Sequence, residues 1–169
     1  MATIVTLLLL FSFHPENLEG LVVGINDGDT ITILVESKQI RIRLFGIDCP
    51  EKGQAFGNSA KQRVSTLCYD TKVIVQTKGT DSFGRTLGFV LLEDGRNLNR
   101  LLVEEGLAWW YRKYAPQDSQ LKRAEEAANT GRRGLWSDKN PVPPWEYRVS
   151  EKQVRGDYYQ QFSVPVPRP

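Results

Sequence analysis

Histidine and cysteine are scarce in this sequence of 169 residues, which has one histidine and two cysteines. This scarcity argues against a structural zinc site of the Cys–His type and leaves little for a nucleophilic triad that depends on histidine. Cys49 and Cys68 permit one disulfide but do not imply one. Cys68 continues the apolar spacing of Ala60 and Val64, and this spacing predicts a buried free thiol at position 68.

A long apolar run is also missing. Residues 2–13 form an uncharged, mainly apolar run of twelve residues, whereas a helix needs about 20 residues to span a bilayer. The run resembles the core of a secretory signal, although no lysine or arginine precedes it and no small-x-small cleavage site stands before Gly20. We favour an export signal, which predicts a secreted or periplasmic protein, or one retained at the membrane by this segment. The alternative is that the run packs as a first strand of the fold.

A strong net charge of either sign is absent. The formal net charge is +2, from 22 basic and 20 acidic residues. This weakly basic balance allows a nucleic-acid partner without requiring one. The hydrophobic content of 40% and the charged content of 25% are ordinary for a soluble globular protein, and the length suits one domain with a tail.

The composition predicts three parts along the chain. Residues 1–19 form the signal-like apolar segment, residues 20–137 a single domain, and residues 138–169 a polar tail. The tail prediction rests on two proline clusters, because residues 140–145 and 164–169 contain three prolines each. Such a composition is typical of an extended or disordered segment.

Alternating apolar and polar residues indicate strands in several segments. In residues 39–46, Ile42 and Leu44 fall on one face and Arg43 on the other. Strands are predicted at residues 21–25, 30–35, 39–46, 72–78, 86–93 and 107–110, and helices at residues 56–69, at residues 98–105 and between Pro116 and Gly131. This order predicts a mainly β fold with helices (α+β), a five-stranded oligonucleotide-binding (OB) Greek-key barrel with about three packed helices. A generic α+β sheet fits the same pattern and remains the alternative.

Charged residues gather in three short blocks: NDGDT at 26–30, RLFGIDCPE at 43–51 and DSFGRTLGF at 81–89. Each block ends a strand-like run, where folds usually build sites on connecting loops. The carboxylates could hold a hard cation, and the arginines could hold a phosphate in bidentate contacts. The acids are Asp27, Asp29, Asp48 and Glu51, and the arginines are Arg43 and Arg85. Hydrolysis of a nucleic-acid backbone needs both, because negative charge builds on the phosphoryl oxygens.

Each of these residues also has a purely structural interpretation. Asp27 and Asp29 are of the type that forms turns, and Arg43 could pair with Asp48 or Glu51 to brace a loop. Glu51 lies three residues beyond Asp48, across a proline that stiffens the loop, and it could instead polarise a water beside a metal. The combination of the blocks, rather than any single residue, favours a functional site.

In combination, the three blocks resemble those of the staphylococcal nuclease (thermonuclease) family. The resemblance rests on DGDT, then R-x4-D-x-P-E, then D-x-[YF]-G-R, in this order, and extends from about Gly20 to Trp136. It implies a five-stranded OB barrel and calcium-dependent cleavage of DNA and RNA, single-stranded or locally melted. It also implies little sequence specificity and products that end in 3′-phosphates. No protein partner is evident, and a monomer is expected.

The resemblance assigns three residues to the metal site. Asp29 and Asp48 match the two calcium carboxylates of the family. Cys49 stands where a backbone carbonyl oxygen joins the calcium ligands, so its thiol is not required. Asp27 is expected to support the site from just outside the ligand set.

Further residues match the reacting and substrate-binding groups of the family. Glu51 matches the glutamate beside the attacking water, and Arg43 and Arg85 match the two arginines that grip the phosphate. Phe83 and Tyr114 match aromatic residues that line the nucleotide pocket. These matches predict a complete set of catalytic groups in this chain.

Three departures from the family pattern bear on substrate binding rather than on the type of reaction. The best-known member has tyrosine at the position of Phe83, lysine at that of Ser82 and a pocket tyrosine at that of Arg112. The alternative function is a non-catalytic OB module that binds nucleic acid or protein. Such modules are expected to lose site residues, whereas every matched acid and arginine is present here.

Overall fold

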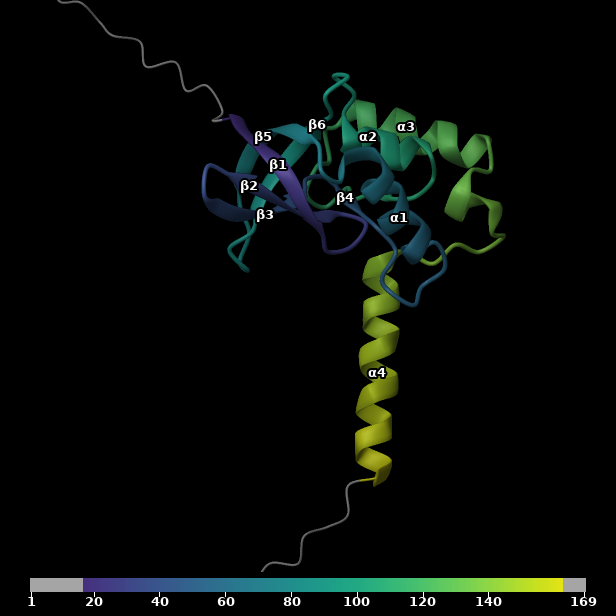
Figure 1. Cartoon of the computed structure of the whole chain (residues 1–169). Helices are drawn as coiled ribbons and strands as arrows, with labels where there is room; N and C mark the ends of the chain where they lie inside the picture. Colours follow the sequence, from purple (N-terminus) through teal and green to yellow (C-terminus); the bar gives the residue numbers. More distant parts are fainter. Residues whose placement is uncertain (1–16, 163–169) are drawn as a thin grey trace, which may run out of the picture.

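The computed structural model describes residues 17–162 and the side chains of residues 17–154. Five strands form a closed barrel in the order β1-β2-β3-β6-β5 (Figure 1). They are β1 (Asn17–Ile25), β2 (Thr30–Val35), β3 (Lys38–Leu44), β5 (Lys72–Thr80) and β6 (Thr86–Leu91), and β4 (Ile47–Asp48) and β7 (Trp109–Trp110) form a separate two-stranded sheet. Neighbouring barrel strands are antiparallel except β3 and β6, which are parallel. The predicted five-stranded OB barrel is confirmed.

The alternation seen in the sequence places the barrel core. In β3, Ile42 and Leu44 are buried, whereas Arg41 and Arg43 lie on the opposite face. β-branched residues predominate inside, because they pack well on a pleated surface. The buried barrel residues are Val22, Ile31, Ile33, Ile42, Leu44, Val73, Val75 and Val90.

Three helices pack beside the barrel, as the sequence predicts (Figure 1). They are α1 (Gly57–Cys68), α2 (Leu98–Glu104) and α3 (Ser119–Thr130). α1 buries Ala60, Val64 and Cys68 at helical spacing. α3 begins after Asp118, whose carboxylate accepts two backbone N–H groups of the first turn.

Both cysteines are free and buried. The Cys68 thiol donates to the carbonyl oxygen of Val64 at 3.2 Å, and burial raises the pKa of Cys68 to about 12. Burial also raises the pKa of Cys49 far above its ordinary value. Both thiols therefore stay protonated at neutral pH and behave as small apolar side chains. The predicted buried free thiol at position 68 is confirmed.

The chain beyond residue 138 differs from the sequence prediction. Much of the segment predicted to be extended or disordered forms α4 (Pro144–Phe162), which projects away from the barrel (Figure 1). Pro144 occupies the first helical position, where a missing N–H has no cost. Glu146 in the first turn suits the positive end of the helix dipole. Apolar residues form no stripe along this segment, so hydrophobic periodicity did not reveal the helix.

Only the last residues of the predicted N-terminal segment, residues 17–19, belong to the described part of the structure. β1 begins at Asn17, within the predicted segment 1–19, because residues 17–20 pair with β5. The apolar run at residues 2–13 lies outside the described residues. Between residues 17 and 162, no helix is long and apolar enough to cross a membrane. The domain limits at residues 20 and 137 stay predictions.

A buried asparagine on α2 fixes the chain just after β3. The side chain of Asn99 donates to the carbonyl oxygens of Phe45 at 2.9 Å and Gly88 at 3.1 Å. Its Oδ1 accepts the backbone N–H of Val90 at 3.0 Å. A buried polar group with all of its partners forms a rigid connection. Asn99 therefore holds the turn between β3 and β4 against β6, next to the site described below.

Candidate active site

A cavity of about 680 Å³ lies where the three charged blocks meet. All the predicted site residues line it: Asp27, Asp29, Arg43, Asp48, Cys49, Glu51, Phe83, Arg85 and Tyr114. The barrel register explains part of this convergence, because Thr30 at the start of β2 pairs with Arg43 near the end of β3. β6 begins beside the same part of β3, since Ile42 pairs with Thr86. The fold therefore brings the three blocks to one place.

Arg43 lies between two buried carboxylates. Its Nη1 pairs with Asp29 Oδ1, and its Nη2 donates to Asp48 Oδ1 at 2.7 Å. The side chains of Asp29 and Asp48 are 7% and 1% exposed. Charge-assisted hydrogen bonds are strong, and a buried carboxylate without a partner would be costly. Of the two partners that the structural interpretation allowed for Arg43, Asp48 is found, and the structure adds Asp29.

The NDGDT turn holds Asp29 in place from two sides. Asp27 Oδ1 accepts the backbone N–H of Asp29 at 3.0 Å, as in an Asx turn. Asp29 Oδ2 accepts the backbone N–H of Cys49 at 2.7 Å, and Asp29 Oδ1 accepts the hydroxyl of Thr30 at 3.3 Å. Asp27 thus shapes the turn that carries Asp29, and Asp29 links this turn to the second charged block.

Glu51 lies on the loop between β4 and α1. Its backbone N–H donates to Gln54 Oε1 at 3.0 Å, and its carbonyl oxygen accepts the N–H of Gln54 at 2.9 Å. The loop packs closely on the start of α1, because a Cβ added at Gly57 would stand 2.1 Å from the Glu51 carbonyl oxygen. Gly57 therefore allows the approach that places the Glu51 side chain at the cavity.

We expect Gly57→Ala to destabilise the protein and to displace the Glu51 loop. Alanine gains about 1 kcal/mol over glycine in a helix, but overpacking costs about 1–3 kcal/mol, and here the obstacle is a backbone atom. Chemical denaturation measures the difference. The matched control is Gly24→Ala in β1, where an added Cβ would lie 3.4 Å from the nearest atom. Equal stability of Gly57→Ala and the wild type would show that the loop is not held in this way.

Arg85 is held by the turn between β5 and β6. Asp81 Oδ1 accepts the N–H groups of Phe83 and Arg85, each at 2.9 Å, and Asp81 Oδ2 accepts Arg85 Nε at 2.7 Å. Gly84 in this turn has a φ of 76°, which favours glycine. Burial opposes the charge on Asp81, but the hydrogen bonds from Arg85 and Phe83 outweigh it and lower the Asp81 pKa. Sequence reasoning missed this organising role, although an aspartate at the start of a turn is a signal for it.

Two exposed aromatic rings border the cavity. Phe83 is 82% exposed, and the guanidinium carbon of Arg85 lies 5.5 Å from its ring centre. Tyr114 is 57% exposed, and its ring meets that of Tyr111 edge to face at 4.9 Å. Neither exposed ring belongs to the hydrophobic core. Both rings are therefore accessible to a ligand in the cavity.

Arg112 has a structural role instead of a place in the cavity. Its Nη2 pairs with Glu125 Oε2, and its guanidinium carbon lies 4.7 Å from the ring centre of Trp110. Burial raises the pKa of Glu125, although the charge of Arg112 works in the opposite direction. Arg112 does not line the cavity. Compared with the family's tyrosine at this position, Arg112 therefore supplies neither an aromatic ring nor a positive charge to the cavity.

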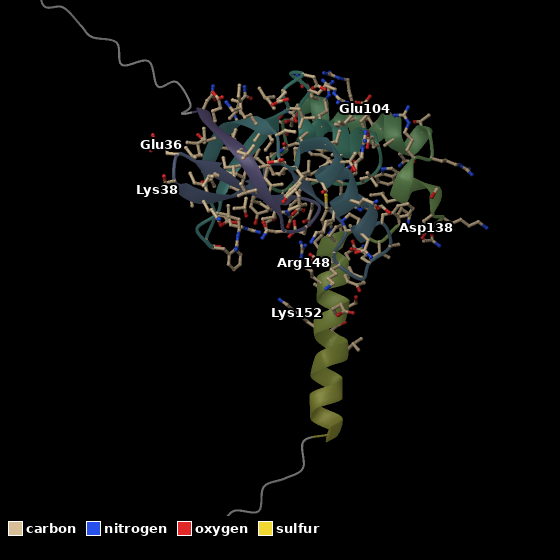
Figure 2. The ribbon with its side chains drawn as sticks, viewed as in Figure 1. Glu36, Lys38, Glu104, Asp138, Arg148 and Lys152 are labelled. Atoms are coloured by element: carbon tan, nitrogen blue, oxygen red, sulfur yellow. The ribbon has the colours of Figure 1, made fainter. Side chains whose placement is uncertain are left out.

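An arginine that sequence reasoning missed reaches the cavity from α4. Arg148 Nη1 donates to Glu51 Oε1 at 2.6 Å, and Nη2 donates to Asp48 Oδ2 at 2.8 Å. Partial burial opposes its charge, but the hydrogen bonds to Asp48 and Glu51 outweigh this effect and raise the Arg148 pKa. Figure 2 shows Arg148 at the end of α4 that meets the body of the protein, with Lys152 farther out. Two prolines before an aromatic and an acid, as in PPWEYR, could have signalled this helix start.

The charge of the cavity suits a divalent cation. Among the described residues it is lined by five carboxylates and three arginines, which gives a formal charge of 3 − 5 = −2. Carboxylate oxygens are the ligands that calcium and magnesium prefer. Asp29 and Asp48 offer such oxygens at the cavity, where they now pair with Arg43. Among the side chains that the structure describes, those of residues 17–154, no group of three or more His, Cys, Asp or Glu is arranged for a metal. A cation here would need backbone, water or substrate oxygens as further ligands.

Fold and cavity together define an OB-barrel protein whose site combines acids with arginines, as catalysts of phosphodiester chemistry do. The family model described as "Staphylococcal nuclease homologue" matches residues 41–138. This match covers more than half of the chain, and the chain belongs to the staphylococcal nuclease family. The resemblance seen in the three charged blocks is thereby confirmed.

Several curated relatives are similar over most of the chain. A "Micrococcal nuclease" of Shigella flexneri is 46% identical over an alignment of 144 residues that covers 80% of this chain and 83% of that protein. "Protein ParB" of Escherichia coli is 41% identical over an alignment of 149 residues that covers 83% of this chain and 84% of that protein. An "Uncharacterized endonuclease" of Haemophilus influenzae is 40% identical over 146 residues, 86% of this chain and 81% of that protein.

Proposed function

We propose that this protein is a nuclease that hydrolyses phosphodiester bonds of DNA and RNA with calcium as its cofactor. The observation that carries the proposal is the guanidinium of Arg43 shared by two buried carboxylates, in a cavity that also holds Glu51 and Arg85. Membership of the staphylococcal nuclease family supports it. So do the names of two relatives, a micrococcal nuclease and an endonuclease.

Calcium would be held by the carboxylates of Asp29 and Asp48 and by the carbonyl oxygen of Cys49. A phosphodiester is an anion, and a cavity with a formal charge of −2 repels it unless a cation offsets that charge. When bound, calcium supplies positive charge beside the phosphoryl oxygens and lowers the pKa of an adjacent water. Asp27 keeps Asp29 in position by accepting its backbone N–H.

The side chains that line the cavity have different roles in the proposed hydrolysis. Glu51 orients the attacking water and takes its proton. Arg43 and Arg85 donate to the non-bridging oxygens of the phosphate, where negative charge builds in the transition state. The water oxygen bonds to phosphorus, the bond between phosphorus and O5′ breaks, and solvent returns a proton to O5′. The products are a 3′-phosphate and a 5′-hydroxyl.

The exposed rings of Phe83 and Tyr114 account for low sequence specificity. Every base has a face that can stack on an aromatic ring, and such stacking contributes about 1–3 kcal/mol per base. Paired bases are already stacked on their neighbours, so a single-stranded or locally melted substrate suits these rings. All the side chains used in the proposed reaction come from one chain, and we propose that the protein acts as a monomer.

End analysis of the products tests this function. Labelled single-stranded DNA and RNA of several sequences are incubated with the protein and calcium, and the fragments are then treated with a 3′-phosphatase. We expect cleavage at many positions and a change in fragment mobility after phosphatase treatment. Fragments with 5′-phosphates would refute the proposed bond cleavage. Binding without cleavage would favour the alternative, a non-catalytic OB module.

Asp29→Asn is expected to weaken calcium binding, because it removes one of two carboxylates from the proposed ligand set. We expect the calcium Kd, measured by titration calorimetry, to rise by roughly 10-fold or more. Asp94→Asn is the matched control, since Asp94 pairs with Arg96 on the exposed surface and outside the cavity. If the two variants bind calcium equally well, Asp29 is not a ligand.

We also propose that residues 2–13 direct export of the protein. The run carries no charge and contains four consecutive leucines, which is the apolar core that an export pathway reads. Export would also separate a nuclease of low specificity from the genome of its own cell. N-terminal sequencing of the protein from each cell fraction is the test. A processed exported product, or an intact chain in the membrane fraction, is expected, and a soluble cytoplasmic protein that begins at Met1 rules export out.

A further inference from the structure

The start of α4 is attached to the cavity wall and to the Glu51 loop. Trp145 stacks on Tyr111 with ring centres 5.1 Å apart and an angle of 5° between the rings. Tyr111 itself lines the cavity. Gln54, in the loop after Glu51, donates through Nε2 to the carbonyl oxygen of Val142 at 2.6 Å. These contacts hold the first turns of α4 against the site, while the rest of the helix projects away from the barrel (Figure 1).

Both terminal nitrogens of the Arg148 guanidinium donate hydrogen bonds to carboxylates of the site. Nη1 donates to Glu51 Oε1 at 2.6 Å and reaches Asp48 Oδ1 at 3.4 Å, and Nη2 donates to Asp48 Oδ2 at 2.8 Å. Arg43 donates to Asp48 Oδ1 at 2.7 Å, so Asp48 is held by two arginines. The side chain of Glu51 is 40% exposed. A glutamate this exposed would sample several rotamers if the contact with Arg148 were absent.

We propose that Arg148 is a positioning residue that orients the Glu51 carboxylate toward the attacking water. The inference rests on the function proposed above. Arg148 acts through Glu51, because its Nη1 donates directly to the Glu51 carboxylate at 2.6 Å. It therefore affects turnover more than substrate binding. Its planar fork bridges two carboxylates at a fixed spacing, which a lysine ammonium can imitate only in part. A side chain that merely blocked the cavity would have the opposite effect on turnover when removed.

Steady-state kinetics of the full chain on single-stranded DNA with saturating calcium test the proposal. We expect Arg148→Ala to lower kcat by about 10-fold to 100-fold, to leave KM close to the wild-type value, and Arg148→Lys to recover part of the loss. DNA affinity in excess chelator, measured by fluorescence anisotropy, is expected to stay unchanged. Lys152→Ala removes a positive charge one turn farther along α4, outside the cavity, and is expected to match the wild type.

A double-mutant cycle with Glu51→Gln separates positioning from an independent effect. If Arg148 acts through Glu51, adding Arg148→Ala to Glu51→Gln has little further effect on kcat. Equal losses in both backgrounds, or a kcat of Arg148→Ala at or above the wild-type value, would overturn the inference and leave the proposed function intact. An inactive wild type would overturn both. Circular dichroism establishes whether each variant is folded. If Arg148→Ala does not fold, the same comparison is made with Arg148→Lys.

Discussion

Arg43→Ala is expected to lower kcat by about 10²–10³-fold, equivalent to about 3–4 kcal/mol of transition-state stabilisation. The guanidinium is preorganised between two carboxylates and faces the cavity where a phosphate would lie. Removing it also leaves Asp29 and Asp48 buried without this partner, and breaking a buried ion pair costs about 3–5 kcal/mol of stability. Kinetics and thermal unfolding are therefore measured together, with calcium present at saturation.

Two further variants separate catalysis from stability at this position. Arg43→Lys keeps the charge and loses the fork, so it should fold better than Arg43→Ala and still turn over slowly. Arg85→Ala should also lower kcat strongly, with less effect on stability, because its partner Asp81 lies in a turn at the surface of the barrel. Arg96→Ala, on a surface pair outside the cavity, is the control. Near-normal turnover in both Arg43→Ala and Arg85→Ala would refute the assignment.

Glu51→Gln is expected to lower turnover by about 10²–10⁴-fold, the usual contribution of a general base. Glutamine has almost the same shape as glutamate and can still accept a hydrogen bond from Arg148 through its amide oxygen. The fold and the binding of single-stranded DNA should therefore persist. Single-turnover kinetics measure the chemical step, and fluorescence anisotropy in chelator measures binding.

The control for this variant is Glu126→Gln on α3. Glu126 faces Lys122 at 3.8 Å on the exposed side of the helix and does not line the cavity. Its substitution removes the same charge without touching the site, so turnover should match the wild type. An undiminished rate in Glu51→Gln would leave Glu51 with only a structural role in its loop.

The barrel was predictable because its signals are local. Ile42 and Leu44 alternate with Arg43 along one strand, and this alternation identifies the buried face wherever the strand pairs. The pairing itself is not local. The parallel contact of β3 with β6 depends on residues far apart in the chain, and so does the buried Asn99 of α2, which binds β6 and the turn after β3. No pattern within either strand specifies them.

In the site, too, the residues in short motifs could be predicted, whereas a residue that only a tertiary contact brings there could not. Arg43 and Glu51 were predicted because their motifs are short and ordered. Arg148 was not, because it lies on a helix without an apolar stripe, and only the folded chain brings it to residues 97 and 100 positions away. Arg112 illustrates the reverse case. The family comparison predicts a pocket position for Arg112, whereas its ion pair with the buried Glu125 holds Arg112 outside the cavity.

We propose that this cavity hydrolyses nucleic acid and needs calcium to do so. The most direct test is the rate of single-stranded DNA cleavage by the full chain at constant ionic strength, with calcium, with magnesium and with excess chelator. We predict cleavage with calcium, a slower rate with magnesium because its strict octahedral geometry suits this open ligand set less well, and none in chelator. Cleavage in excess chelator at the rate seen with calcium would contradict the claim.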